Sequence, residues 1–213
     1  MAAQVIPPLL SIFVDSSDGT RLPDNITYAE GALLEPLSVV MRGIQVARLH
    51  LGRGVVVCGA GPIGLIALAA ARASGAHPIV VTDLDTNRLA FAKEFTPTCI
   101  PYQMDPKLDA EGNAAAIRAL FGKEEYSAPE TVLECTGVEP SICTAAYTAR
   151  RGGNMVVIGV GKSIMNNLPF MHLSLAEVGP VLPFIEIVTL MIDRLTCVSS
   201  IAIATPGRRR LPV

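Results

Sequence analysis

The stretch "VVVCGAGPIGLIALAAARASGAH", from Val55 to His77, decides the fold. A short β-branched run meets Gly59, Gly61 and Gly64 and continues as an alanine-rich segment with helical spacing. An apolar run of this length predicts a strand buried on both faces, and the segment after it predicts a helix from Pro62 to Ser74. The stretch therefore predicts a strand–turn–helix unit whose turn is a G-x-G-x-x-G loop.

Each glycine of this loop has a distinct expected role. Gly59 permits a tight turn out of the strand, Gly61 lets a pyrophosphate approach the backbone, and Gly64 lets the helix pack closely on the sheet. The N–H groups and the dipole at the helix start, around Pro62 and Ile63, favour negative charge. The loop predicts a dinucleotide site; a glycine turn without a ligand and a flavin site stay open as alternatives.

The acidic residue at the end of the next predicted strand indicates which dinucleotide is bound. Asp83 lies 19 positions after Gly64, and a carboxylate there can accept both ribose hydroxyls but repels a 2′-phosphate. This favours NAD over NADP. Arg88 is an argument for NADP, because it could receive that phosphate. It could equally stack on the adenine or pair with Asp85.

The rest of the chain alternates strand and helix patterns. We expect strands at 55–58, 79–82, 99–102, 131–135 and 155–160, and helices at 31–47, 62–74, 87–94, 110–121 and 141–149. Thr27 and Glu30 have capping-box spacing just before the first helix. The alternation predicts an α/β protein, a Rossmann doubly wound parallel sheet. The expected division is an irregular segment (1–22), a helical linker (23–50), an NAD-binding domain (51–177) and a divergent tail (178–213).

The composition excludes several kinds of partner. The formal net charge is −2 and no long basic block is present, so nucleic-acid binding is not expected, and Arg208–Arg210 is interpreted as a solvated tail. The apolar segment Val181–Ile192 is too short and too polar for a membrane span.

Cysteines and histidines form no recognisable metal motif. The five cysteines have no C-x-x-C spacing, which is typical of reduced thiols in a cytoplasmic protein; Cys58 and Cys135 are expected to be small core residues. None of the three histidines, His50, His77 and His172, is paired with a carboxylate or cysteine at ligand spacing, so we interpret them as surface or turn residues. His172 follows a strand-like "LPFM".

Five stretches, in order along the chain, resemble a known family: "LPDNITYAEGALLEPLSV", "VVVCGAGPIGL", "VVTDLDTNRLAFAKE", "LECTGVEPSI" and "GGNMVVIGVGK". They are similar to the zinc-dependent medium-chain dehydrogenases, in the polyol branch of sorbitol, xylitol and L-arabinitol dehydrogenases. The resemblance extends from about Arg21 to Glu177. It implies oxidation of a secondary alcohol to a ketone, with zinc orienting the alkoxide and the nicotinamide accepting hydride.

The resemblance also implies roles for single residues. Asp83 and Arg88 match adenosine-ribose contacts of the family. The turn of Thr136 and Gly137 would lie near the cofactor. The turn of Val160 and Gly161 would lie beside the nicotinamide. Glu35, in "LLEPLSV", matches a glutamate that reaches toward the catalytic zinc and its water; its alternative role is to favour the start of the following helix.

The zinc ligands of the family lie in a catalytic domain before the first of these stretches. Here residues 1–21 contain no cysteine or histidine, so we expect the catalytic domain to be absent and this sequence to hold no metal ligands. We expect a polyol or ketose to be used as substrate only if the catalytic domain is supplied. Two alternatives stay open: a non-catalytic NAD-binding module, which could form homo- or hetero-oligomers through its sheet edge, and a fragment arising from a mistaken gene model.

Overall fold

The structure, a computed structural model, describes residues 25–162 and 164–179. Its centre is a five-stranded sheet with strand order β3-β2-β1-β4-β5, in which every neighbouring pair is parallel. The strands are β1 (Val55–Cys58), β2 (Ile79–Asp83), β3 (Ile100–Gln103), β4 (Thr131–Glu134) and β5 (Asn154–Val157). The predicted α/β doubly wound sheet is confirmed.

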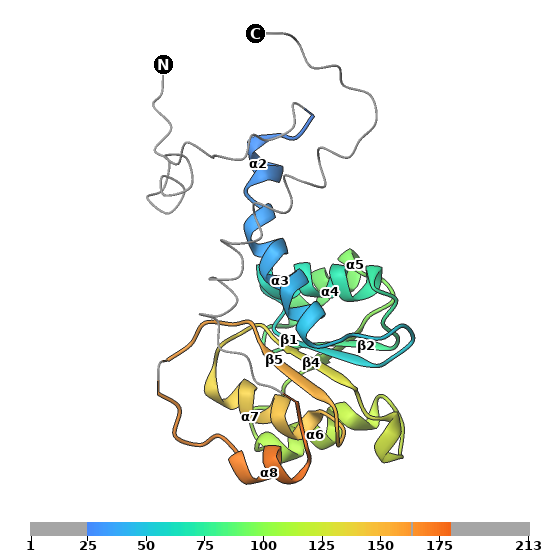
Figure 1. Ribbon diagram of the computed structural model, residues 1–213, viewed down its shortest axis with the longest axis vertical. Helices are drawn as coiled ribbons and strands as arrows, with labels where there is room; N and C mark the ends of the chain where they lie inside the picture. The colour runs from blue at the N-terminus through green and yellow to red at the C-terminus, as the bar shows by residue number, and fades with distance from the viewer. Residues whose placement is uncertain (1–24, 163, 180–213) are drawn as a thin grey trace. The chain divides into compact units, whose positions relative to one another are not determined.

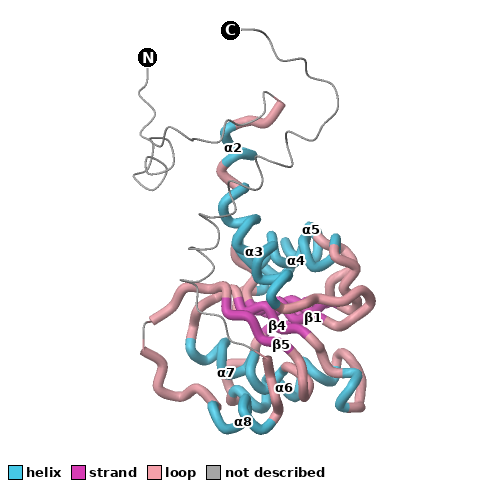
Figure 2. Tube along the Cα trace, viewed as in Figure 1, coloured by secondary structure: helices cyan, strands magenta, loops and turns pink. Residues whose placement is uncertain are grey.

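Helices cover both faces of the sheet (Figures 1 and 2). Those on one face are α3 (Leu34–Val46), α4 (Pro62–Ala73) and α5 (Thr86–Phe95); those on the other are α6 (Ala110–Ala119), α7 (Glu139–Thr148) and α8 (Phe170–Leu175). A short 3-10 helix, η1 (Glu125–Ser127), precedes β4. None of the helices in the described part of the chain is long and apolar enough to cross a membrane.

The helix α2 (Tyr28–Gly31) belongs to a separate structural unit. The Thr27 hydroxyl accepts a hydrogen bond from the Glu30 N–H group, and the Glu30 carboxylate accepts one from the Thr27 N–H group at 2.8 Å. The capping box predicted from the spacing is therefore confirmed.

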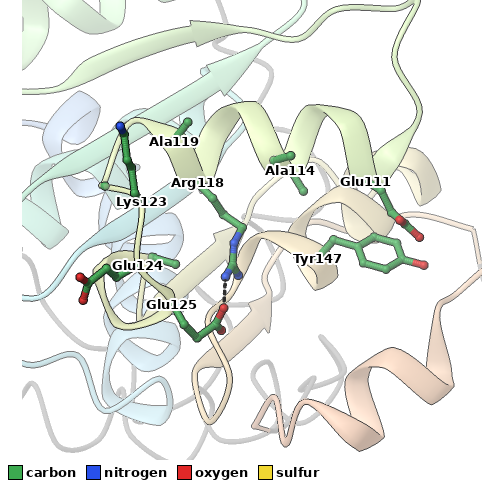
Figure 3. A pocket seen from close by; sticks show the side chains of 11 residues that line it. Glu111, Ala114, Arg118, Ala119, Lys123, Glu124, Glu125 and Tyr147 are labelled. Carbon is green, nitrogen blue, oxygen red and sulfur yellow. Dashed lines mark hydrogen bonds and ion pairs between the residues drawn. The ribbon is translucent and has the colours of Figure 1, made fainter.

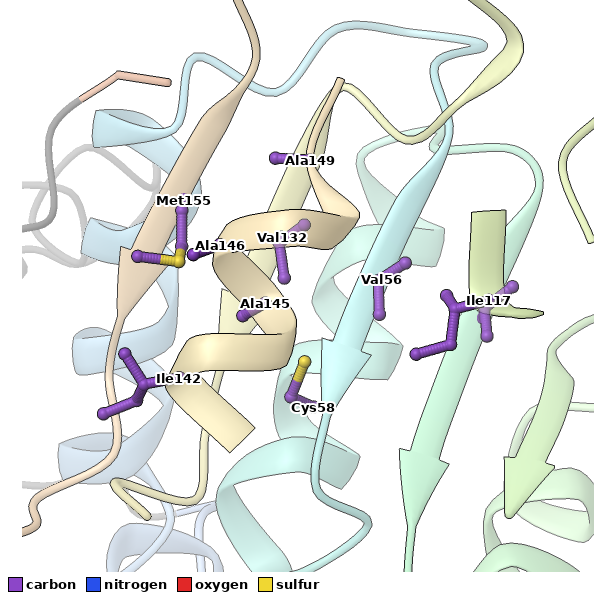
Figure 4. Close-up of a cluster of buried hydrophobic side chains, with 10 residues drawn as sticks. Val56, Cys58, Ile117, Val132, Ile142, Ala145, Ala146, Ala149 and Met155 are labelled. Atoms are coloured by element: carbon purple, nitrogen blue, oxygen red, sulfur yellow. The ribbon is translucent and has the colours of Figure 1, made fainter. Parts of the chain in front are cut away.

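The main core cluster lies between the sheet and the helices α6 and α7 (Figure 4). Val56, Val132 and Met155 project from neighbouring strands toward small residues of α7, Ala145 and Ala146, all of them fully buried. Small side chains on α7 let the helix approach the sheet, which is the close packing expected of a protein interior. This packing fixes the start of α7 relative to the carboxyl end of β4.

The edge strand β3 contains Pro101. Proline lacks an N–H group and is confined within sheets to edge strands and bulges. The strand order explains why the residue is tolerated here, because β3 pairs only with β2 among the described strands.

Two sequence interpretations are corrected by the structure. The strand-like "LPFM" leads into the helix α8, which begins at Phe170; the apolar run was too short to separate the two states. The last predicted strand, 155–160, is shifted and shorter, and β5 ends at Val157. Asn154, the first residue of β5, pairs with Gly179 in one parallel bridge. The predicted tail beyond Gly179 lies outside the described residues.

Candidate functional site

The strand order places a switch point between β1 and β4. In doubly wound sheets, ligands bind outside the carboxyl ends of the strands at this point, where the chain connections turn in opposite directions. The G-x-G-x-x-G loop follows β1 here, and the turn after β4 adjoins it. A ligand site is therefore expected at the carboxyl end of the sheet.

The three glycines of the loop have different environments. Gly59 has a φ of +97°, in the left-handed region that favours glycine. A Cβ atom on Gly64 would overlap the carbonyl oxygen of Gly59, so the helix α4 packs directly on the turn. A Cβ atom on Gly61 would meet nothing within 4 Å. The structural roles predicted for the first and third glycines are confirmed, and the space at the second is open for a ligand.

The start of α4 lacks a side-chain cap. Gly61 is its N-cap and makes no capping hydrogen bond, and Pro62 occupies the first helical position, where its missing N–H group costs little. The N–H groups of the first turn, including those of Ile63 and Gly64, have no carbonyl partner within the helix. With the open space at Gly61, this arrangement fits a pyrophosphate.

Asp83 is tied to the glycine loop. Its Oδ2 atom accepts a hydrogen bond from the Ala60 N–H group at 2.8 Å, and its Oδ1 atom accepts one from the Asp85 N–H group at 2.9 Å. Each oxygen still has a lone pair for a further donor. The carboxylate is thus held beside the loop.

The Arg88 side chain takes no part in this arrangement. The backbone N–H group of Arg88 lies 3.4 Å from Asp85 Oδ1, because Asp85 caps the N-terminus of α5. In the described residues its guanidinium forms no ion pair, so of the three predicted roles the pairing with Asp85 involves the backbone alone.

Glu134, the last residue of β4, is a buried carboxylate that sequence reasoning missed. It is fully inaccessible to solvent. Its Oε1 atom accepts hydrogen bonds from the Thr136 N–H group at 3.0 Å, the Thr136 hydroxyl and the Ser141 hydroxyl at 2.8 Å. Its Oε2 atom accepts one from the Gly137 N–H group at 2.8 Å. A charged residue at a strand end is ordinarily exposed, so only the three-dimensional structure reveals this arrangement.

The turns after β4 and β5 are packed backbone to backbone. Gly137 has a φ of +70°, and a Cβ atom on it would overlap the backbone of Val160 and Gly161. On the other side, a Cβ atom on Gly59 would lie 2.7 Å from the Thr136 methyl group. The structure therefore brings the glycine loop, Thr136–Gly137 and Val160–Gly161 together at the carboxyl end of the sheet.

Two cysteines lie under these turns. Burial raises the pKa of the Cys58 thiol, and the nearby charge of Glu134 adds to this effect. Burial also raises the pKa of Cys135 well above its ordinary value, again with a contribution from Glu134. Both are therefore protonated at neutral pH and unsuited to act as nucleophiles. The prediction of a core position is confirmed for Cys58, which is buried, whereas Cys135 is partly exposed.

Glu35 and the histidines do not assemble a metal site. Glu35 is exposed on the first turn of α3. Within residues 25–162 and 164–179, no three histidine, cysteine or acidic side chains are grouped so as to hold a metal ion. The described part of the chain therefore does not fit a catalytic zinc.

The histidine interpretation is confirmed for His50 and His77, which are both exposed, and is wrong for His172, which is partly buried in a helix. His77 is exposed in a turn, as predicted. His50 Nδ1, however, lies 2.8 Å from Glu130 Oε1, a partner 80 residues away that no local spacing could indicate. His172 belongs to α8 and packs against Tyr147, with 4.5 Å between the ring centroids.

A surface hollow of about 570 Å³ lies beside α6, η1 and Tyr147 of α7 (Figure 3). Its wall includes Arg118, which forms an ion pair with Glu125. The glycine loop and the turns after β4 and β5 contribute nothing to its lining. The hollow is therefore separate from the candidate site.

A family model described as zinc-binding dehydrogenase matches residues 62–181. The chain belongs to this family, and it is similar in sequence to polyol dehydrogenases. It is 50% identical over 159 residues to an L-arabinitol 4-dehydrogenase of Aspergillus oryzae, across 72% of this chain and 41% of that protein. It is 46% identical over 158 residues to a sorbitol dehydrogenase of Bos taurus, across 74% of this chain and 42% of that protein. The chain thus spans less than half the length of these relatives.

Solved structures show the same relationship. The 2R,3R-butanediol dehydrogenase of Bacillus subtilis matches with a TM-score of 0.63 at 25% identity, covering 82% of this chain and 49% of that one. The L-idonate 5-dehydrogenase of Escherichia coli matches with a TM-score of 0.60 at 26% identity, covering 74% and 42%. Membership of this dehydrogenase family supports a nucleotide cofactor for the chain.

Proposed function

We propose that this chain supplies the NAD-binding part of a polyol dehydrogenase that oxidises a secondary alcohol to a ketone. The observation that carries the proposal is the position of Asp83, whose carboxylate accepts the Ala60 N–H group inside the G-x-G-x-x-G loop. A negative charge fixed beside a pyrophosphate-binding loop suits the free ribose hydroxyls of NAD and disfavours a 2′-phosphate.

The residues of the loop would hold the dinucleotide. The N–H groups of Gly61, Ile63 and Gly64, at the start of α4 and beside the open space at Gly61, would bind the pyrophosphate. Pro62, at the first helical position, has no N–H group and would favour the start of the helix. Asp83 would accept the ribose hydroxyls. When bound, NAD supplies the hydride acceptor.

The other residues implied by the family would lie along the rest of the cofactor. Thr136 and Gly137 would contact its central part, and Val160 and Gly161 would border the nicotinamide. Glu35 is proposed only as a group facing a zinc site built by other residues. Arg88 would contact the adenosine from the outer face of α5, where its side chain is exposed.

The names of the relatives support a substrate class for the complete enzyme. Their names refer to L-arabinitol and sorbitol, which supports a polyol or its ketose as substrate once metal ligands are supplied. We also propose that the chain divides into a linker (23–50) and a dinucleotide domain (51–177) and that it forms a homo- or hetero-oligomer. We propose a cytoplasmic location, which the cysteine pattern supports.

The test combines binding and turnover on the folded 213-residue chain. NADH and NADPH are titrated by cofactor fluorescence after circular dichroism has verified the fold. The chain is then incubated with NAD, zinc and a panel of sorbitol, xylitol and L-arabinitol, and NADH formation is followed. We expect saturable binding that favours NADH.

The outcomes separate the alternatives. Turnover would show that zinc ligands are supplied within the chain or its oligomer. Binding without turnover would show that the chain binds the cofactor but needs metal ligands from another domain or subunit to act. A folded chain that binds neither nucleotide would overturn the proposal.

A further inference from the structure

Glu134 is the one fully buried carboxylate among the described residues, and the proposed function gives it no role. Its four side-chain hydrogen bonds come from two backbone N–H groups, which can only donate, and two hydroxyl groups. An ionised carboxylate, with both oxygens accepting, matches this set of donors. It also lies near the N-terminus of α7, whose first turn carries Ser141, and a helix N-terminus favours negative charge.

These bonds determine the shape of the turn after β4. The Thr136 hydroxyl donates to Glu134 and accepts the Val138 N–H group at 3.1 Å, so the carboxylate is linked through it to the N-cap of α7. Gly137, held by Oε2, adopts a left-handed conformation at the middle of the turn. The turn thus depends on one side chain rather than on a regular backbone ladder.

The same residue reaches the other two loops of the candidate site. Its main-chain carbonyl accepts the N–H groups of Ile158 at 2.7 Å and Gly159 at 2.9 Å, where the chain leaves β5. The Thr136 methyl group faces Gly59 in the glycine loop. One residue therefore connects all three loops at the carboxyl end of the sheet.

We infer that Glu134 is a positioning residue for the dinucleotide site: its carboxylate holds the 135–138 turn against the glycine loop and against the turn after β5. This inference rests on the proposed function for its ligand, while its geometry stands independently of it. Because the Glu134 side chain is fully buried, it would act on the cofactor only through Thr136 and Gly137, to which it is hydrogen-bonded.

The substitution Glu134→Gln tests this with little change in shape. One end of the amide becomes a donor, and whichever way it turns, a backbone N–H group of Thr136 or Gly137 loses its acceptor. Hydrogen bonds to charged groups of this kind correspond to roughly a tenfold change in an equilibrium, so we expect the Kd for NADH to rise about tenfold or more. We also expect faster hydrogen exchange at the Gly137 amide.

Two further variants separate positioning from general loss of stability. Ser141→Ala removes a single bond to the same carboxylate and should raise the Kd for NADH in the same direction by a smaller factor. Val132→Ala truncates a buried core residue two positions earlier on β4, and should lower stability while leaving the Kd of the folded fraction unchanged. If Glu134→Gln does not fold, the Kd for NADH of Ser141→Ala is compared with that of Val132→Ala instead.

The readouts distinguish the possible failures. If the two site variants bind NADH like the unaltered chain, or no more weakly than Val132→Ala, Glu134 is only structural and the inference is overturned. If the unaltered chain binds no nucleotide, the proposed function is wrong, and so is the inference that Glu134 positions a dinucleotide site. The structural part of the inference can still be tested in that case. If hydrogen exchange at the Gly137 amide is as slow in Glu134→Gln as in the unaltered chain, Glu134 does not hold the 135–138 turn.

Discussion

Two buried glutamates bracket the strand β4 and are held in opposite ways. Glu130, just before the strand, faces the His50 imidazole at 2.8 Å and the guanidinium groups of Arg150 at 3.1 Å and Arg53 at 3.3 Å. Glu134, the last residue of the strand, faces only N–H and hydroxyl groups from the residues that follow it. One carboxylate is thus stabilised by charges from distant segments, the other by local dipoles.

The difference separates the two ends of the sheet. At the amino end, the ion pairs of Glu130 tie the segment between α3 and β1 to the segment between α7 and β5. At the carboxyl end, glycines and backbone N–H groups shape loops that approach one another closely. Ion pairs respond to pH and salt, whereas buried dipoles respond little. We expect the amino end to govern acid stability and the carboxyl end to govern cofactor binding.

The largest expected effect is a loss of stability at the glycine loop. In Gly64→Ala the new methyl group would overlap the Gly59 carbonyl oxygen, so the helix α4 must move off the turn. We expect the free energy of unfolding to fall by about 3 kcal/mol, the upper range for overpacking. Urea unfolding measures this, and an unchanged midpoint would contradict the packing described here.

Gly61→Val should affect binding rather than stability. The position has open space around it and an ordinary φ of −77°, so we expect the free energy of unfolding to change by only about 0.5 kcal/mol. The side chain would fill the space assigned to the pyrophosphate and raise the Kd for NADH by roughly a hundredfold, or about 2.7 kcal/mol. Isothermal titration measures the Kd; retained affinity would place the pyrophosphate elsewhere.

Glu130→Gln should act only at the amino end. Two of the three partners of Glu130, His50 and Arg53, are more than half exposed, so we expect a loss of only about 1–2 kcal/mol in the free energy of unfolding. The Kd for NADH should not change. Guanidinium is unsuitable as denaturant because it screens ion pairs, so urea unfolding at two salt concentrations provides the measurement.

The same variant predicts a pH dependence. Burial raises the pKa of Glu130, but hydrogen bonds and charges from His50 and Arg150 outweigh it and hold the pKa below 4.5. Its contribution to stability is therefore complete above about pH 4.5 and is lost as the pH falls through the lowered pKa. The difference in stability between the unaltered chain and Glu130→Gln should shrink on acidification; a constant difference from about pH 7 to about pH 3 would contradict the ion-pair account.

The smallest expected effect is on cofactor choice. Asp83→Asn keeps an acceptor for the Ala60 N–H group but removes the charge. A screened contact between two charges is worth about 1 kcal/mol, so the preference for NADH over NADPH should fall by roughly fivefold. Parallel fluorescence titrations with the two nucleotides provide the ratio. Equal weakening for both nucleotides would count against the ribose assignment.

The sequence was most informative where chemistry restricts the choice of residue. The run Val55–Cys58 is fully buried in a central parallel strand, and such a run needs no alternation to be recognised. Gly59 and Gly64 could be assigned because a left-handed turn and a close helix contact exclude side chains. The helix start at Pro62 followed from the same loop.

The sequence was least informative about contacts between distant residues. Nothing local links His50 to Glu130, and the burial of Glu134 depends on a turn whose shape follows from the assembled sheet. The helix α8 was missed because its short apolar run has no side-chain cap and, in the structure, no buried residue. Pattern reasoning thus found the glycine loop but not the carboxylate beneath its neighbouring turn.

The most direct test of the account is a map of amide chemical-shift changes in the folded chain on addition of NADH. The account predicts that the largest changes occur at the carboxyl end of the sheet, at Gly61, Ile63, Gly64, Gly137 and Gly161, and that amides around Glu130 do not move. Changes centred instead on the α6–η1–α7 hollow, or none at saturating nucleotide, would contradict the claim that the loops joined by Glu134 form the dinucleotide site.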